Sequence, residues 1–591
     1  MKNKIIYFII LATLIISCND DSLDLYPLTS LSSETFWNTE NDLQVYNNIF
    51  YNYARSSAMR LLNGHNTGGY NGPYARDGMT DNDNRSFAFN TAHTKIRAGI
   101  IIPDENPFSW GWNNSCFSFV RAINIGLANY DNADISQSII DKYKAEARLF
   151  RGWVVADKVS LYGDYPWIDR ELNIDSEELF AERTPRETVM EKVLADLDYA
   201  CEYLPDDWGD GSAPGRLNRW SALLIKSRVC LFEGTWRKYH GGTNPDSWLQ
   251  AAADAAKELI DNGPYQLYST GDTAHDYNAI FQKDDLTGVD EVMYWRRYMP
   301  GVVTNSWETY FYMNCATKSM VEDYLCTDGL PINLSDLYQG DEVFENLFEN
   351  RDPRLRQTVL HPDDVGYYNY GGYGDTGTEI PVLLGMAGAY YSQTGYHTVK
   401  QSNYEQAKLV HDGYTPCVIL RFGEALLNYA EAKAELGTLS QSDLDISINK
   451  LRDRVGMVNM DIDNIPVDPR YADWGVSPLI VEIRRERRIE LFGEGFRFDD
   501  IRRWKLGEII MTKKDYGMRW DEANRNRFDP GPEPSVTLGY EVDPETGIEY
   551  ICPNKDSELE YPVFEDKHYL WPIPVDARSE NPALGQNPGW E

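Results

Sequence analysis

The stretch YKAEARLFRGWVVADKVSLYG, residues 143–163, decides the fold class of this 591-residue chain. Its apolar residues recur at helical spacing over Tyr143–Tyr162, and Gly163 follows directly after them. Such spacing predicts a helix with one buried face. A glycine just past the last apolar residue is the expected C-terminal cap. Residues 143–162 are therefore expected to form a helix that packs against a neighbour.

Several other segments share this pattern and extend the prediction to the whole chain. They are Thr188–Leu204, Trp220–Phe232, Trp248–Ile260, Ile419–Leu436 and Leu479–Phe492, of which two are followed by the expected glycine caps Gly234 and Gly437. Repeated helix pairs with alanines at close approaches predict a tetratricopeptide-like stack, although the pairs are not evenly spaced. The expected fold is mainly α, a tetratricopeptide-like helical repeat scaffold with long irregular loops and few short strands.

Long stretches between these helices are rich in Gly, Asn, Asp, Pro and aromatic residues. They are Gly64–Ala92, Met299–Ala316, His361–Thr398 and Asp529–Glu560. Loops of this length in a compact protein are usually functional or disordered. Aromatic residues argue against disorder, so these loops are expected to be irregular, ordered and the place where function resides.

The first residues predict an export signal. Lys2 and Lys4 precede the apolar run Ile5–Ile16, which ends at Ser17-Cys18. This is the pattern of a secretory signal, and the run is shorter than the roughly 20 residues that span a bilayer. Residues 1–17 are expected to be a lipoprotein signal peptide, with palmitate-type acyl chains attached at Cys18. Two or more such chains anchor a protein stably. An ordinary signal peptide with an incidental cysteine is the alternative.

Composition narrows the classes of function. Charged residues make up 25% of the chain and hydrophobic residues 42%, which is ordinary for a folded protein. The net charge of −36 argues against nucleic acid as a partner and against docking onto anionic lipid surfaces. The seven cysteines beyond Cys18 form no CxxC pair. We expect them to be small buried hydrophobic residues.

A set of motifs in a fixed order resembles the SusD/RagB family of Bacteroidetes outer-membrane nutrient-binding lipoproteins. The motifs are EARLFRG at 146–152, LYGDYP at 161–166, RERRIELFGEGFR at 485–497, DDIRRW at 499–504 and WPIP at 571–574, followed by the terminal QNPGW at 586–590. The resemblance covers nearly all of the chain after the signal. It implies a SusD-like N-terminal helical-repeat region at 18–290 and a SusD/RagB C-terminal region at 291–591.

The resemblance also implies a location and a partner. Cys18 would tether the protein to the outer membrane, and the acidic Asn19-Asp20-Asp21 is similar to the tag that directs such lipoproteins to the cell exterior. The partner would be a SusC-like TonB-dependent transporter, over which the protein would close as a lid by a hinge motion. The ligand would be a nutrient glycan. No cofactor, metal or nucleic acid is expected.

The long loops supply the side chains that a sugar site requires. Sugar rings lay their C–H faces on aromatic rings, and their hydroxyls need planar or charged partners. Family sites are built from corresponding loops. The candidate ligand-binding residues are Tyr70, Tyr74, Asp77, Asp81, Trp110, Trp307, Tyr310 and Tyr391.

Four other features are not assigned to the ligand site by this pattern. Trp112 is expected in the core and Trp590 as an apolar plug at the end of the chain. The run Arg485–Arg488, interleaved with glutamates, is expected to form helical ion pairs and contacts to nearby loops. The acidic run Asp81–Asn84 lacks the glycine and distal glutamate of an EF-hand, so it would hold an adventitious calcium at most.

Three other functions are alternatives to glycan binding. The 92 Asp and Glu residues could supply a carboxylate pair for glycoside hydrolysis. The chain nevertheless has no HExxH, GxSxG, Walker or GxGxxG motif, and we expect no enzyme activity. The second candidate is capture of peptides or protein fragments for a RagA-type transporter, which would favour sheet edges. A purely structural surface protein is disfavoured, since it would not need a transporter-partner signature.

Overall fold

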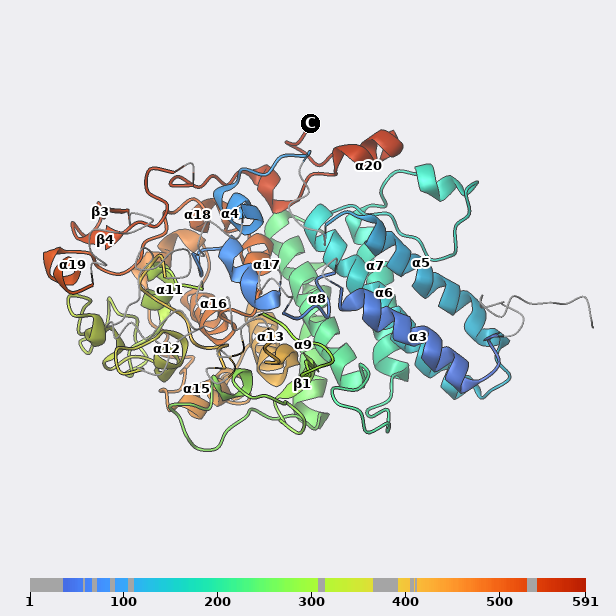
Figure 1. Cartoon of the computed structure of the whole chain (residues 1–591), viewed down its shortest axis with the longest axis horizontal. Helices are drawn as coiled ribbons and strands as arrows, with labels where there is room; N and C mark the ends of the chain where they lie inside the picture. Colours follow the sequence, from blue (N-terminus) through green and yellow to red (C-terminus); the bar gives the residue numbers. More distant parts are fainter. Residues whose placement is uncertain are drawn as a thin grey trace, which may run out of the picture.

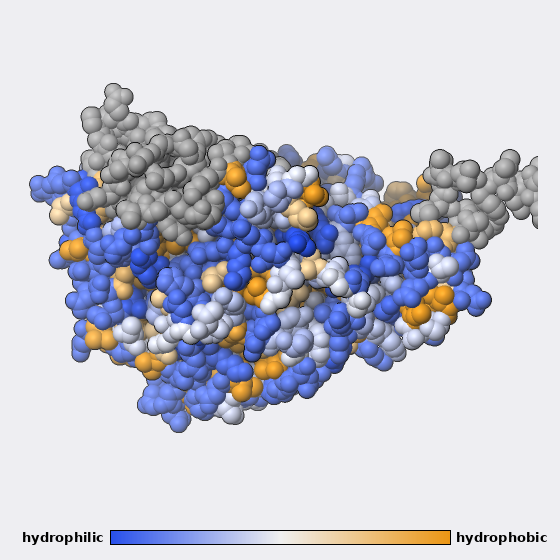
Figure 2. All heavy atoms as spheres, turned by 60° about the horizontal axis from the view of Figure 1, so that its bottom comes forward, coloured by the Kyte–Doolittle hydropathy of each residue, from blue (hydrophilic) through white to orange (hydrophobic). Residues whose placement is uncertain are grey.

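The computed structural model of the protein describes residues 36–56, 59–65, 72–84, 91–104, 111–306, 314–364, 392–403, 406, 409, 412–528, 539–557 and 559–591. Their fold is mainly α, as predicted, with four short strands in these ranges. None of the helices within them is both long and apolar enough to cross a membrane. The face drawn in Figure 2 is largely hydrophilic, with apolar residues scattered over it.

Long helices in sequence order form the body of the molecule. They are α3 (Glu40–Ala54), α5 (Asn114–Asn129), α6 (Gln137–Tyr162), α7 (Arg186–Tyr203), α8 (Arg219–His240), α9 (Pro245–Asn262), α13 (Phe422–Glu435) and α16 (Pro478–Glu490). Helix α6 packs on α7 and α8 packs on α9, so consecutive helices pair as in a repeat stack. Helix α13 then packs on α9 and α8, and α16 packs on α13, which carries the stack across the molecule (Figure 1).

Shorter elements surround this stack. The helices are α4 (Thr91–Ala98), α11 (Lys318–Asp323), α12 (Pro353–Thr358), α14 (Gln441–Asp445), α15 (Ile448–Val455), α17 (Arg497–Arg503), α18 (Gly507–Ile510), α19 (Glu522–Phe528) and α20 (Val575–Glu580). Single 3-10 turns include η2 (Pro73–Met79), η5 (Glu177–Phe180), η6 (Ala279–Phe281) and η13 (Pro582–Leu584). Turn η2 lies inside a stretch that was expected to be wholly irregular.

The strands form two small antiparallel sheets. Strand β1 (Val292–Arg296) pairs with β2 (Cys417–Arg421), with Trp295 opposite Val418. Strand β3 (Tyr540–Val542) pairs with β4 (Glu549–Ile551). The first sheet corrects one helix boundary, because residues 417–421 are extended and the helix predicted from Ile419 begins only at Phe422.

A second correction concerns Gly234, which was expected to end a helix. Helix α8 continues through it to His240 and ends at Gly241, which has the left-handed φ of 85°. A Cβ at position 234 would lie 2.8 Å from the Cγ of Leu249. Gly234 therefore permits the close approach of α8 and α9 rather than capping a helix. The caps predicted at Gly163 and Gly437 are confirmed, with φ values of 73° and 69°.

The largest hydrophobic cluster among the described residues draws on both expected regions of the chain. It joins α3 and α5 through α9 to α13, and it includes Trp571 and Trp590. Trp590 is buried, as predicted, and its indole nitrogen donates to the carbonyl of Leu570 at 3.0 Å. Trp112 also lies in this cluster, where it makes an edge contact with the ring of Tyr162. Six of the seven described cysteines are buried, and all seven are free thiols.

Candidate functional site

An irregular ladder joins backbone segments that lie far apart in the sequence. Cys315 is in its middle and forms an antiparallel bridge with His397. On its other side Ala316 bridges to Asp83, and the amide of Asn84 donates to the carbonyl of Cys315 at 2.9 Å. We call residues 82–84, 314–317 and 396–398 the stem ladder. Residues 82–84 and 314–317 directly flank the stretches 85–90 and 307–313, and residues 396–398 follow the stretch 365–391 after residues 392–395. All three stretches lie within the predicted loops.

Further backbone bonds extend the stem ladder on both sides. The amide of Leu360 donates to His397 at 2.8 Å, so both flanks of residues 365–391 lie side by side. The amide of Thr398 donates to Asn314 at 3.2 Å. Nearby, the amide of Asn305 donates to Gly413 at 2.7 Å. The predicted loops around 307–313 and 365–391 therefore start from one shared framework.

An aspartate clamps this framework to α16 and α17. The carboxylate of Asp81 accepts from Arg488 at 2.8 Å and from Arg497 at 2.9 Å. Its carbonyl accepts from the hydroxyl of Thr317 in the stem ladder at 2.5 Å. Burial alone would raise the pKa of Asp81, but the two guanidinium groups outweigh it and lower the pKa to about 2. Asp81 is therefore ionised and fixed in place at neutral pH.

Tyr74 and Asp77 likewise contact the chain itself. The hydroxyl of Tyr74 accepts from the amide of Val418 at 2.8 Å. The carboxylate of Asp77 accepts from Asn82 at 2.9 Å and from the amide of Gly493 at 2.8 Å, and burial raises its pKa. Tyr74, Asp77 and Asp81 are only 3%, 1% and 7% exposed. These three predicted ligand residues thus lie inside the framework instead of at a ligand surface, and each makes hydrogen bonds to other parts of the chain.

The remaining predicted ligand residues lie outside the described residues. They are Tyr70, Trp110, Trp307, Tyr310 and Tyr391, and Cys18 lies outside them as well. The stem ladder flanks the stretches that carry Trp307, Tyr310 and Tyr391. Trp112, two positions after Trp110, is not part of the stem ladder. It packs on Tyr162 and Tyr165 near the end of α6.

The arginine run of α16 forms ion pairs, as predicted. Arg485 contacts Glu482 three residues earlier at 3.1 Å and Asp468 at 2.6 Å. Arg488 pairs with Asp81, and Arg487 pairs with Asp500 at 2.9 Å. Most partners come from distant segments rather than from the helix itself. The run therefore joins α16 to the surrounding loops.

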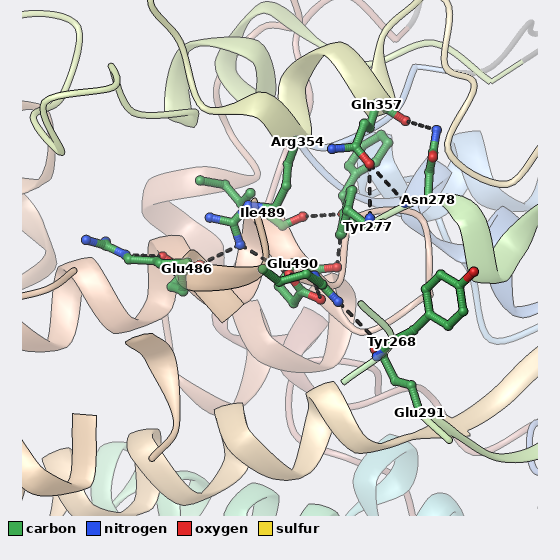
Figure 3. Close-up of polar contacts among 12 residues, drawn as sticks. Tyr268, Tyr277, Asn278, Glu291, Arg354, Gln357, Glu486, Ile489 and Glu490 are labelled. Carbon is green, nitrogen blue, oxygen red and sulfur yellow. Dashed lines mark hydrogen bonds and ion pairs between the residues drawn. The ribbon is translucent and has the colours of Figure 1, made fainter. Parts of the chain in front are cut away.

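The last glutamate of α16 continues this network. Glu490 accepts from Arg354 at 3.1 Å and from Arg421 and Arg454 at 2.8 Å each. Figure 3 shows Arg354 reaching across to Glu490 and Glu486, with Tyr277 donating from its hydroxyl to the backbone beside them. Burial opposes ionisation, but the three guanidinium groups hold the pKa of Glu490 far below its usual range. Charges this deeply buried are stable only when they are paired in this way.

Sequence reasoning missed the residues that connect the loops. Cys315 and His397 were not singled out, since their pairing depends on chain segments that meet only in the fold. Asp81 is a ligand candidate in the sequence, and no local pattern indicates its ion pair, because Asp81 and Arg488 are 407 positions apart.

Comparisons with known proteins agree with this architecture. Residues 278–590 match the SusD family. A SusD-like protein P2 of Formosa agariphila is 23% identical over 92% of this chain and 99% of its own length. A SusD-like protein of Bacteroides ovatus is also 23% identical, over 92% of this chain and 94% of its own length.

Solved structures show the same fold. A crystal structure of a SusD-like carbohydrate binding protein from Bacteroides fragilis superposes with a TM-score of 0.71 and covers 93% of this chain and 100% of its own. Its sequence is 21% identical to this chain, so the similarity supports the fold alone. The family match spans more than half of the chain, and the motifs at 485–504 and 571–590 fall inside it. The chain belongs to the SusD family.

Proposed function

We propose that this protein is a non-catalytic, cell-surface lipoprotein of the outer membrane that binds a nutrient glycan, either an oligosaccharide or a polysaccharide. It delivers this glycan to a SusC-type TonB-dependent transporter. Membership of the SusD family supports the proposal. A structural relative from Bacteroides fragilis is described as a carbohydrate binding protein, which favours a glycan over other nutrients.

One observation carries the binding part of the proposal. The stem ladder brings together the flanks of stretches that contain Trp307, Tyr310 and Tyr391. Backbone bonds hold the ladder, and the buried pairs of Asp81 with Arg488 and Arg497 fix it to two helices. A binding site works best when rigid elements position its contact residues. Aromatic residues carried on such a base suit the flat C–H faces of sugar rings.

Calorimetry with a matched pair of variants tests this site. The protein is titrated with a panel of polysaccharides and, as a second arm, with protein digests. Trp307→Ala is expected to weaken glycan binding by roughly 1–3 kcal/mol, by analogy with other aromatic stacking platforms, and to leave the melting temperature nearly unchanged. Trp307→Phe keeps a ring and should keep most of the affinity.

Two results would contradict this assignment. A large drop in melting temperature with unchanged affinity would make Trp307 a core residue, whose removal typically costs roughly 3–5 kcal/mol of stability. Binding of peptides and of no glycan would replace the proposal with peptide capture for a RagA-type transporter.

The anchor and the lack of catalysis have separate tests. Cys18→Ala is expected to give a folded protein that leaves the membrane fraction after a wash that removes the transporter. Retention after this wash would show that another element anchors the chain. Incubation with a bound oligosaccharide is expected to generate no new reducing ends, whereas their accumulation would assign an enzyme activity.

A further inference from the structure

A groove of about 990 Å³ lies apart from the stem ladder. Its walls come from three places: α5, the loop of residues 166–181 that carries η5, and α20 near the end of the chain. Figure 1 shows α5 and α20 on the same side of the molecule. The groove is lined by Trp112, Phe117, Arg121, Arg170, Glu178 and Phe180, among other residues. None of these residues takes part in the stem ladder.

Hydrogen bonds to backbone carbonyls hold the three walls together. Arg121 of α5 donates to Leu172 at 2.8 Å, and Asn124 of α5 donates to Ile168 at 2.9 Å. At the other end of the loop, Asn581 donates to Ala181 at 3.0 Å. The loop is therefore tied both to α5 and to the segment after α20. A preformed groove of this kind loses little free energy to ordering when it binds a ligand.

Aliphatic and aromatic side chains together form the apolar part of the groove, and the aromatic ones are Trp112, Phe117 and Phe180. Trp112 and Phe117 pack edge to face with their centroids 5.6 Å apart, and Phe117 stacks on Tyr165. Phe180 is different, because it is 63% exposed and no residue of η5 is buried. Its ring is available to a ligand.

Charged side chains that form solvent-exposed ion pairs complete the groove. Arg170 forms a two-pronged pair with Glu178 across the same loop, with distances of 2.9 and 2.8 Å. Arg121 pairs with Glu171 at 2.6 Å. All four side chains are 41% to 54% exposed. Exposed pairs of this kind contribute little to stability, so their donors and acceptors can bind hydroxyl groups instead.

We propose that this groove is a second glycan-binding site, specific for an oligosaccharide. An aromatic ring beside planar charged groups matches the two requirements of a sugar, an apolar face and hydroxyl partners. The volume lies at the upper end of the roughly 300–1,000 Å³ typical of small-ligand sites, which favours several sugar rings over one. The lining elements among the described residues are helices, 3-10 turns and loops, so they offer no sheet edge for a peptide. Charges at the rim disfavour an acyl chain.

Hydrogen exchange read by mass spectrometry locates each site independently. The full chain is incubated with saturating maltohexaose, cellohexaose, xylohexaose, mannohexaose or laminarihexaose in turn. At least one is expected to slow exchange in peptides covering 112–121, 168–181 and 574–584. Phe180→Ala should raise the ligand concentration needed for this protection at least tenfold. It should leave any protection of the stem ladder unchanged.

A matched control lies in the same loop. Ile174 is 86% exposed and does not line the groove. Ile174→Ala should therefore need the same ligand concentration as the wild type for groove protection. Both variants remove an exposed side chain, so both should have the melting temperature of the wild type. Equal effects of the two variants would overturn the assignment of Phe180.

The outcomes separate this proposal from the proposed function. Protection of the stem ladder without protection of the groove overturns the second site alone. Protection of the groove without the stem ladder supports the second site and counts against the loop site, whereas protection of neither counts against both. Trp307→Ala should leave groove protection intact. Groove protection by a casein digest and by none of the sugars would make the groove a peptide site and overturn the proposal.

Discussion

Two arginine–glutamate pairs with nearly the same geometry lie in opposite surroundings. Arg354 and Glu486 are 2.5 Å apart, and each side chain is 1% exposed. Arg121 and Glu171 at the groove are 2.6 Å apart, with side chains 54% and 47% exposed. The distances alone would rank the two pairs as equals. Solvent decides the difference, because water screens the second pair and is excluded from the first.

The difference teaches what each group of charges does. Beneath α16, each charge depends on its partners, since an unpaired buried ion is strongly unfavourable. Those residues therefore fix the framework that carries the loops. At the groove, each charge can return to water when its partner leaves. Such residues are free to exchange partners, which is the property that ligand contacts need.

The largest expected effect comes from breaking the buried pair. Glu486 accepts from Arg354 and also from Arg452 at 2.9 Å. Glu486→Gln removes the negative charge that both guanidinium groups share, so we expect a loss of roughly 3–5 kcal/mol in the free energy of unfolding. Urea denaturation measures it as a lower midpoint at constant slope.

Glu171→Gln is the matched control for this variant. It makes the same carboxylate-to-amide change in a solvent-exposed pair. It is expected to alter the free energy of unfolding by no more than roughly 0.5 kcal/mol. Similar losses in the two variants would show that burial does not distinguish the pairs.

The helices were predictable, but their ends depended on packing. The segments from Tyr143, Thr188, Trp248 and Leu479 are all helical, because their periodicity reflects a local preference and one buried face. Gly234 was misread since a glycine needed for close packing looks the same in sequence as a glycine cap. Only the position of Leu249 on the neighbouring helix distinguishes the two cases.

A medium effect is expected from the pH dependence of the clamp at Asp81. Its pKa is lowered from 3.8 to about 2 in the folded protein. A lowered pKa stabilises the fold above the unfolded value, and this contribution is lost as the pH falls through the folded value. We expect about 2 kcal/mol to disappear between about pH 5 and pH 2. Asp81→Asn should flatten the dependence by that amount.

Urea denaturation at several pH values across this window measures the slope for both proteins. The variant is also expected to be less stable at pH 7, since Arg488 and Arg497 lose their shared partner. A slope equal to that of the wild type would mean that folding does not lower the pKa of Asp81.

The location of the site in the long loops stays a prediction, whereas the structure places some of the residues predicted for it. Aromatic and polar residues single out these loops in the sequence, but Tyr74, Asp77 and Asp81 are buried. Composition does not reveal which way a loop side chain faces. Phe180 was overlooked for the converse reason, since one aromatic residue in an acidic stretch forms no pattern. Only the fold shows that Phe180 lines a groove together with residues of α5 and α20.

The smallest expected effect is the coupling between Arg121 and Glu171, and it tests whether the groove can rearrange. A double-mutant cycle with Arg121→Ala and Glu171→Ala isolates this coupling, because the separate bond from Arg121 to the carbonyl of Leu172 is lost in the single and the double variant alike. We expect less than about 1 kcal/mol at low salt. It should shrink further in 1 M NaCl, where charges are screened within about 3 Å. A coupling that is large and insensitive to salt would make the pair part of the framework, like Arg354 and Glu486. Its arginine would then not be available to a sugar hydroxyl, and the groove would have to bind through Phe180 and the pair of Arg170 and Glu178 alone.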